Sequence, residues 1–175
     1  MRPYILAAAA LAAPFAAGTA QAQSVTGTVD IEGFVARRCV LTLSSATISL
    51  GEMAQAANGR LNTSVVDGQN RTLTGFCNGS AATMTVEALP LLNITSPGAP
   101  PAGFDNRVDY TATATTSSAN GTDTSITAGA GSAASIGAFT GNILVTLSAS
   151  SSPTSGILVA GTYQGQVRVT LNPTT

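Results

Sequence analysis

The sequence predicts an all-β protein, a sandwich of seven to nine short strands in one domain. Apolar and polar residues alternate with a period of two in several segments, as in strands with one buried face. Turn dipeptides such as Asn58-Gly59, Asp67-Gly68 and Asn78-Gly79 stand between these segments. Helical periodicity is nearly absent, and neither an internal repeat nor a shift in composition indicates a second domain.

The first 22 residues have the organisation of a cleaved signal peptide. Met1-Arg2 is a short positive region, residues 4–17 are apolar, and Ala20-Gln21-Ala22 matches a cleavage site. The alternative, a transmembrane anchor, needs about 20 apolar residues, which is more than this run has. We therefore expect an exported chain of 153 residues (175 − 22) that begins at Gln23.

Residues 25–35 form the first alternating stretch. One face is apolar or glycine: Val25, Gly27, Val29, Ile31, Gly33 and Val35. The other face is polar: Thr26, Thr28, Asp30 and Glu32. Phe34 is the large apolar residue that falls out of phase. This pattern predicts a strand that buries one face.

Further short strands are expected along the middle of the chain. They cover residues 41–43, 48–50, 65–66, 71–77, 83–89, 108–114 and 142–149. Residues 52–57 could form one helical turn before Asn58-Gly59. The proline-rich residues 93–104 predict a surface loop. Residues 115–137, rich in Ser, Thr, Ala and Gly, are either a long loop or two weak edge strands around Asn120-Gly121.

Residues 157–171 are predicted to form the last and longest strand. Six large residues of this stretch have odd numbers: Ile157, Val159, Tyr163, Val167, Val169 and Leu171. We expect Val159, Tyr163, Val167, Val169 and Leu171 to face the core or a groove over it, with Gln166 and Arg168 facing away. Pro173 should end the strand because proline cannot donate to the ladder.

Cys39 and Cys77 are expected to form a disulfide, since an exported chain matures in an oxidising compartment. The strands that carry them would meet across the sandwich. The link spans 38 residues (77 − 39) and would stabilise the fold by about 4 kcal/mol. The alternative is two free thiols or a metal pair, but a chain without histidine has few ligands for zinc.

The composition argues against nucleic acid binding and catalysis. The chain has 7 basic and 8 acidic residues and no lysine, so no basic stripe is available for nucleic acid. Without histidine, the usual base for a serine or cysteine nucleophile is missing. Asp105 and Asp109 could pair as catalytic carboxylates, but solvated surface groups are the expected state. We therefore expect no enzyme activity, no cofactor, no metal and no small-molecule substrate.

Three segments carry a resemblance to a known family. GTVDIEGFVARRC, residues 27–39, resembles the N-terminal region of chaperone–usher pilins, especially type 1 fimbrial major subunits. Ile48-Ser-Leu-Gly51 is similar to the short strand after the family's first cysteine, and Cys77 is similar to its disulfide partner. Residues 160–171 are similar to its closing strand, a pattern that spore coat U-like secreted proteins share. Unlike many members, the chain has no aromatic residue beside its C-terminus.

The resemblance implies an immunoglobulin-like sandwich at residues 36–175 that lacks its last strand. A periplasmic chaperone would fill the resulting groove temporarily, and an outer-membrane usher would assist assembly. Residues 23–35 would then be a donor strand for the neighbouring subunit of a homopolymer, a surface fimbrium that supports adhesion. The implied donor residues are Val25, Gly27, Val29, Ile31 and Val35. The implied groove residues are Val159, Tyr163, Val167, Val169 and Leu171.

One alternative remains at this point. The chain could be a self-contained secreted sandwich, a binding or coat protein, whose own strand completes its sheet. The two hypotheses differ in whether residues 23–35 are free to leave the domain.

Overall fold

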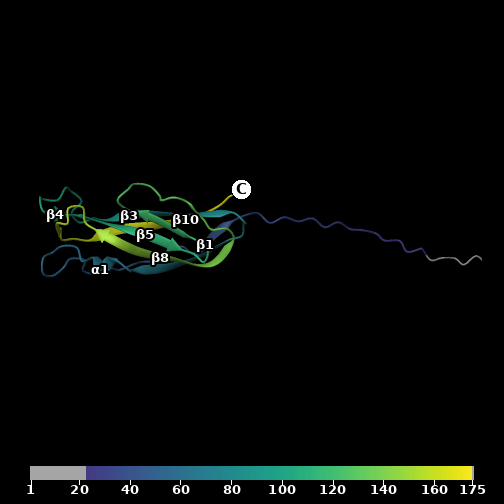
Figure 1. The fold of residues 1–175 in the computed structure, drawn as a ribbon, viewed down its shortest axis with the longest axis horizontal. Helices are drawn as coiled ribbons and strands as arrows, with labels where there is room; N and C mark the ends of the chain where they lie inside the picture. Colours follow the sequence, from purple (N-terminus) through teal and green to yellow (C-terminus); the bar gives the residue numbers. More distant parts are fainter. Residues whose placement is uncertain (1–22, 175) are drawn as a thin grey trace, which may run out of the picture. The chain divides into compact units, whose positions relative to one another are not determined.

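The structure, a computed structural model, describes residues 23–174 (Figure 1). The expected signal peptide, residues 1–22, lies outside the described residues. The chain divides into two units at Phe34, and the second, Val35–Thr175, is the folded domain. Residues 23–38 belong to no strand or helix, and every one of them is exposed.

The domain is an all-β sandwich, as the sequence predicts. One layer contains β1 (Cys39–Leu43), β2 (Asn70–Cys77), β8 (Phe139–Ser151), β5 (Arg107–Thr115) and β6 (Asn120–Thr124). The other contains β7 (Ala134–Ser135), β3 (Ala82–Asn93) and β10 (Tyr163–Pro173). The layers join where β3 pairs with β5, at Leu91–Val108 and Leu92–Arg107. A short parallel pair, β4 (Phe104–Asp105) and β9 (Ile157–Leu158), completes the described strands.

The core lies between the layers and follows the predicted alternation. Eleven hydrophobic residues of three strands are buried: Ala82, Met84, Val86, Ala88, Val108, Tyr110, Ala112, Ala114, Ile143, Val145 and Leu147. Each of these strands sends every second side chain inward. Their inward faces were read correctly from the sequence because a period of two allows one assignment once one face is apolar.

Three local expectations are wrong. Residues 48–50 form no strand. Residues 65–66 belong to a helical turn, α1 (Thr63–Val66), which buries Val66 completely. Residues 157–171 do not form one strand, because the chain leaves β9 at Leu158 and enters β10 only at Tyr163. Such short apolar runs do not distinguish strand from turn without their tertiary neighbours.

The disulfide between Cys39 and Cys77 is confirmed, with an S–S distance of 2.05 Å. The expectation that it spans the sandwich is wrong. The two cysteines face each other in the register of adjacent antiparallel strands, β1 and β2, with their Cα atoms 4.1 Å apart. The bridge therefore fixes the start of β1 to its own sheet.

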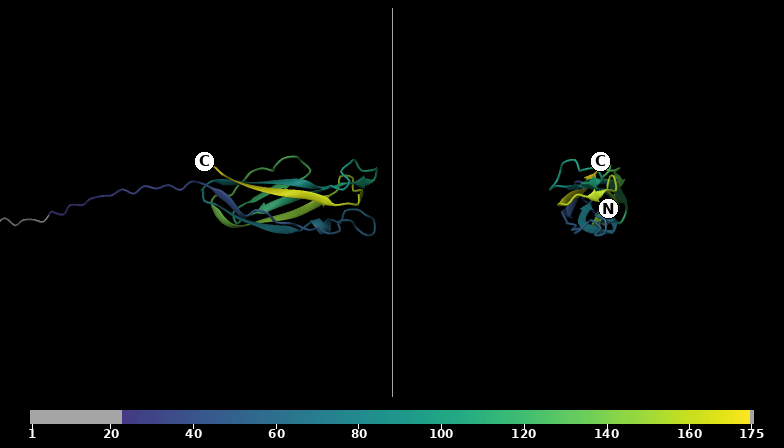
Figure 2. Two further views of the ribbon diagram at one scale, coloured as in Figure 1. Left: turned by 180° about the vertical axis from the view of Figure 1, so that it is seen from behind. Right: turned by 90° about the vertical axis from the view of Figure 1, so that its left-hand side faces the viewer.

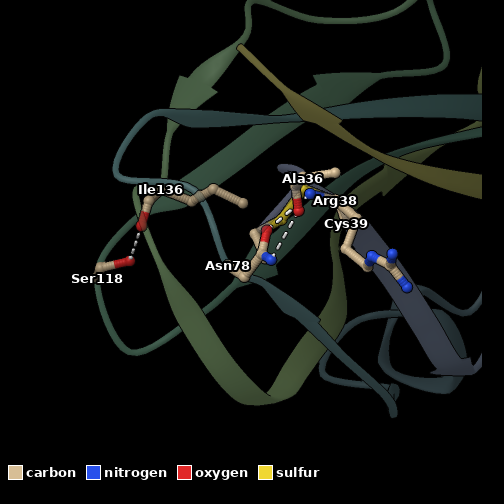
Figure 3. Close-up of a disulfide and its surroundings, with 7 residues drawn as sticks. Ala36, Arg38, Cys39, Asn78, Ser118 and Ile136 are labelled. Atoms are coloured by element: carbon tan, nitrogen blue, oxygen red, sulfur yellow. Dashed lines mark hydrogen bonds between the residues drawn. A yellow bond between two sulfur atoms is a disulfide. The ribbon is translucent and has the colours of Figure 1, made fainter. Parts of the chain in front are cut away.

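The chain entering β1 is also held by Asn78, the residue after Cys77 (Figure 3). The Asn78 side chain accepts a hydrogen bond from the Arg38 backbone N–H at 2.7 Å and donates one to the Ala36 carbonyl at 3.0 Å. The ordered domain therefore begins a few residues before the disulfide.

Candidate functional site

The candidate site lies along the free edge of β10. In the strand path β1-β2-β8-β5-β3-β10, the strands β1 and β10 are the two ends. β10 pairs with β3 from Tyr163 to Pro173, and no described strand pairs with its other edge. Figure 2 (left) shows β10 in yellow running along the domain. An open row of backbone donors and acceptors of this kind can accept a further strand.

A groove follows this edge between β10 and residues 44–50, which continue from β1. Its first part has a volume of about 480 Å³ and its second part, toward residues 158–163, about 630 Å³. Both parts contact Ile48, Leu50 and Leu91, so we treat them as one feature and call it the edge groove. Its remaining apolar lining is Met53, Leu73, Tyr110, Val145, Leu147, Leu158, Val159, Tyr163, Val167 and Val169, with smaller contributions from alanine and glycine. Serine, threonine, glutamine, arginine and glutamate side chains complete the lining.

The predicted groove residues of the C-terminal segment lie as follows. Tyr163, Val167, Val169 and Leu171 are half-buried and pack against the core, while Gln166 and Arg168 are exposed. Val167 and Val169 line the first part of the edge groove, and Val159 and Tyr163 line the second. Leu171 is not among the groove-lining residues. Half-buried and exposed residues thus alternate along β10 from Gln166 to Leu171 as expected. Val159 lies before the strand begins.

Tyr110 forms part of the groove floor, and the sequence analysis did not single it out. Its hydroxyl lies 2.7 Å from the Leu89 carbonyl and 3.1 Å from the Gln166 carbonyl, so it can donate to β3 or to β10. Burial raises the pKa of Tyr110 to about 12. The sequence contains a signal for this role. Tyr110 stands on an otherwise aliphatic face of its strand, and a buried phenol needs a hydrogen-bond partner.

Gly165 brings the backbone of β10 close to β3 beside Tyr110. The register shifts here, with Gln164 opposite Leu92 and Gln166 opposite Leu89, so β3 carries the additional residue. A Cβ at Gly165 would lie 2.9 Å from the carbonyl oxygens of both Leu89 and Pro90. A larger residue at this position would push the two strands apart.

The opposite wall, residues 44–50, is held by Arg71 of β2. The Arg71 Nε donates to the Thr47 carbonyl at 2.7 Å, and its Nη1 donates to the Asn70 carbonyl at the same distance. This wall has no strand hydrogen bonds of its own. Its position therefore depends on a side chain from the neighbouring strand.

Asn93 shapes the end of the groove near residues 159–162. Its side chain is buried and donates to the carbonyls of Val159 and Ala160, at 3.0 and 3.2 Å. Gly161 lies against this side chain with φ +148°, a conformation that favours glycine. These contacts explain why the expected single strand at 157–171 breaks.

The predicted donor residues belong to a separate part of the chain. Val25, Val29, Ile31 and Val35 are between 84 and 92% exposed, and Gly27 has no atom within 4 Å of a Cβ position. Phe34 is equally exposed. The segment thus presents unpaired apolar residues to solvent, which is costly for an isolated chain.

The carboxylates of Asp105 and Asp109 are buried, so the expectation of solvated groups is wrong. Asp105 accepts hydrogen bonds from the backbone N–H groups of Thr154 and Gly156. Burial raises the pKa of Asp105, but these hydrogen bonds, together with those from the Thr154 and Ser152 side chains, outweigh it and the net shift is downward. Asp109 binds Arg107 through two oxygens at 2.7 to 3.0 Å. Each carboxylate therefore has a structural role.

Residues 23–174 contain neither a metal-binding cluster nor a membrane-spanning helix. No group of three or more His, Cys, Asp and Glu side chains there could hold a metal ion. No helix in the same range is long and apolar enough to cross a membrane.

The fold and the site define a disulfide-linked β-sandwich with an open strand edge beside a groove that is lined by both apolar and polar side chains. No family model, curated protein or solved structure matches the chain.

Proposed function

We propose that this protein is a structural subunit of a surface pilus, assembled by donor-strand complementation. The observation that carries the proposal is the edge groove, which an additional strand beside β10 would fill. The sandwich would then be an incomplete immunoglobulin-like domain, and the occupant would be residues 25–35 of a neighbouring copy. Strand addition to a free sheet edge is a general mode of recognition, in which backbone bonds give affinity and alternate side chains fill pockets.

The dimensions and chemistry of the two elements agree. β10 has 11 residues, and residues 25–35 also number 11 (35 − 25 + 1). The donor segment has apolar residues on one face, and the groove floor is apolar. Burying Val25, Val29, Ile31 and Val35 would contribute roughly 1.5–3 kcal/mol each, on the order of 6–12 kcal/mol before the cost of ordering the segment.

The short connection between donor segment and domain favours transfer to another molecule. Asn78 holds Ala36 and Arg38, and the Arg37 guanidinium donates to the Thr174 carbonyl at 2.8 Å. The donor segment thus ends next to residues that are fixed at the start of β1. In the proposed fibre each subunit would receive a strand from one neighbour and supply its own to the next.

The proposed partners follow from the same groove. Before assembly, an exposed apolar groove and free edge would promote aggregation, so a periplasmic chaperone would cover them, and an outer-membrane usher would release the subunit to the growing fibre. The protein would pass through the periplasm by means of residues 1–22 and function at the cell surface in adhesion. No enzyme activity is part of this proposal.

The test compares the mature chain with a variant that lacks residues 23–35. We expect the mature chain to form fibres, detected by size-exclusion chromatography and electron microscopy. The deletion variant should remain unpolymerised but should bind a synthetic peptide of residues 23–35. A stable monomer whose N-terminal segment is protected from protease in its own sheet would contradict the proposal. That result would instead support a self-contained secreted binding or coat protein.

A further inference from the structure

We propose that Arg168 selects and aligns the incoming donor strand by pairing with its two carboxylates, Asp30 and Glu32. This inference rests on the proposed function, because it concerns the same groove. In this proposal, charged side chains on the outer face of the strand pair help to determine which segment binds and in which alignment. The apolar contacts lie on the opposite, inner face.

The charges of the two elements are complementary. Residues 23–36 contain Asp30 and Glu32 and no basic residue. The first part of the edge groove is lined by two arginines, Arg71 and Arg168, and by no acidic residue, while the second part is lined by one, Glu52. An acidic donor strand therefore approaches a rim that carries positive charge, which favours encounter and orientation.

Parity places the carboxylates on the same face as Arg168. If Val29 and Ile31 enter the groove, Asp30 and Glu32 must face outward. Arg168 is exposed and stands between the half-buried Val167 and Val169, so its side chain lies on the outer face of β10, at the rim of the groove. Side chains that lie opposite or diagonal on one face of an antiparallel pair are within reach of each other, above all when one is arginine.

Arg168 retains hydrogen-bonding capacity for such a contact. Its Nε donates to Gln166 at 2.8 Å, and its Nη1 donates to Glu87 of β3 at 3.1 Å. Its Nη2 has no hydrogen-bond partner among residues 23–174. Arg168 would thus bridge Glu87 on the paired side of β10 and an incoming carboxylate on the free side. Arg71 is the other arginine that lines the first part of the groove. It already donates a hydrogen bond to the Thr47 carbonyl and so holds residues 44–50.

The test is a charge exchange within the full mature chain. Arg168→Glu alone and the double variant Asp30→Arg/Glu32→Arg alone should each slow fibre growth about 5- to 10-fold at low salt, because like charges then meet. The triple variant, which combines both changes, should recover most of the wild-type rate. The effect of each partial variant should shrink between about 20 mM and about 500 mM salt, since screening weakens the contact.

Arg60→Glu is the matched control, since it makes the same charge change at an exposed residue that does not line the groove. Growth at the wild-type rate is expected for this control. Slow growth of the triple variant, or equal rates for Arg168→Glu and Arg60→Glu, would overturn the inference and leave the proposed function intact. If the wild-type chain itself forms no fibres, both proposals are wrong.

Discussion

At the scale of single residues, the groove depends on polar contacts beneath its apolar surface. Tyr110 connects β5 to the carbonyls of β3 and β10, and Asn93 fixes the backbone at Val159 and Ala160. Both side chains satisfy backbone groups where the regular ladder is interrupted. An unsatisfied carbonyl in such a place costs more than an average hydrogen bond contributes, so these contacts help determine the shape of the groove.

Tyr110 should make the domain sensitive to alkaline pH. Because burial raises its pKa to about 12 from the ordinary value of 10.0, the folded domain retains the proton that the unfolded chain loses. This stabilisation is complete below pH 10 and is lost as pH rises toward 12. Absorbance titration should show a tyrosine that ionises near pH 12 in the native protein and is missing in Tyr110→Phe. A tyrosine spectrum that titrates fully near pH 10 would contradict this.

Gly161 should be sensitive to substitution. A Cβ there would lie 2.5 Å from Asn93 Oδ1, and the φ of +148° is unfavourable for other residues. We expect Gly161→Ala to lower the free energy of unfolding by about 1–3 kcal/mol, measured by urea denaturation. Gly98→Ala is the control, since Gly98 has no atom within 4 Å of its Cβ position. Equal stability of the two variants would show that the contact with Asn93 is not important.

At the scale of elements, β10 combines a paired edge, a free edge and one half-buried face. The paired edge is regular except at Gly165, and the half-buried face lines the edge groove. Residues 115–137 contain two short strands, β6 and β7, but these do not flank Asn120-Gly121 as expected, because that dipeptide begins β6 itself. There Asp123 accepts a hydrogen bond from the Ala88 N–H at 2.7 Å, and the Gly131 N–H donates to Val86. This region thus covers the part of β3 that β5 does not pair with.

Val169 should be essential for stable accumulation. Val169→Asp would place a carboxylate on the half-buried face of β10, which packs against the hydrophobic core. We expect this variant to fall below detection in export fractions, or to lose about 2–4 kcal/mol of unfolding free energy if it can be purified. Thr170→Asp, a change at the next and exposed position, should accumulate normally. Equal yields would show that the face of β10 is assigned incorrectly.

At the scale of the whole molecule, the chain carries an unpaired apolar segment at one end and an unfilled apolar groove near the other. The first consists of residues 25–35 and the second lies beside β10. Each feature alone is an aggregation hazard. Together they are complementary in length, polarity and charge, which is the basis for proposing ordered polymerisation.

Gly27 provides a test of this complementarity that leaves the domain unchanged. Because Gly27 lies in the exposed segment and in phase with the apolar donor residues, Gly27→Val should slow fibre growth by adding bulk on the inserting face. The folded domain should unfold at the same urea concentration as wild type. Thr28→Val, on the opposite face, should assemble normally. Unchanged growth of Gly27→Val would contradict insertion of this face.

The sequence alone determined which faces of β3, β5, β8 and β10 point inward, because alternation with a period of two leaves no other assignment. It also identified the cysteine pair, since two cysteines in a chain that is expected to be exported have few alternatives. Tertiary contacts decided the rest. Residues far away in sequence determine that Cys39 and Cys77 pair inside one sheet. They also determine the break at Gly161 and the burial of Asp105 and Asp109. The edge groove is likewise a property of strand order, because only the fold shows that β1 and β10 are the ends of the path. Local patterns report which side of a strand is buried, whereas long-range pairing decides which edge remains open.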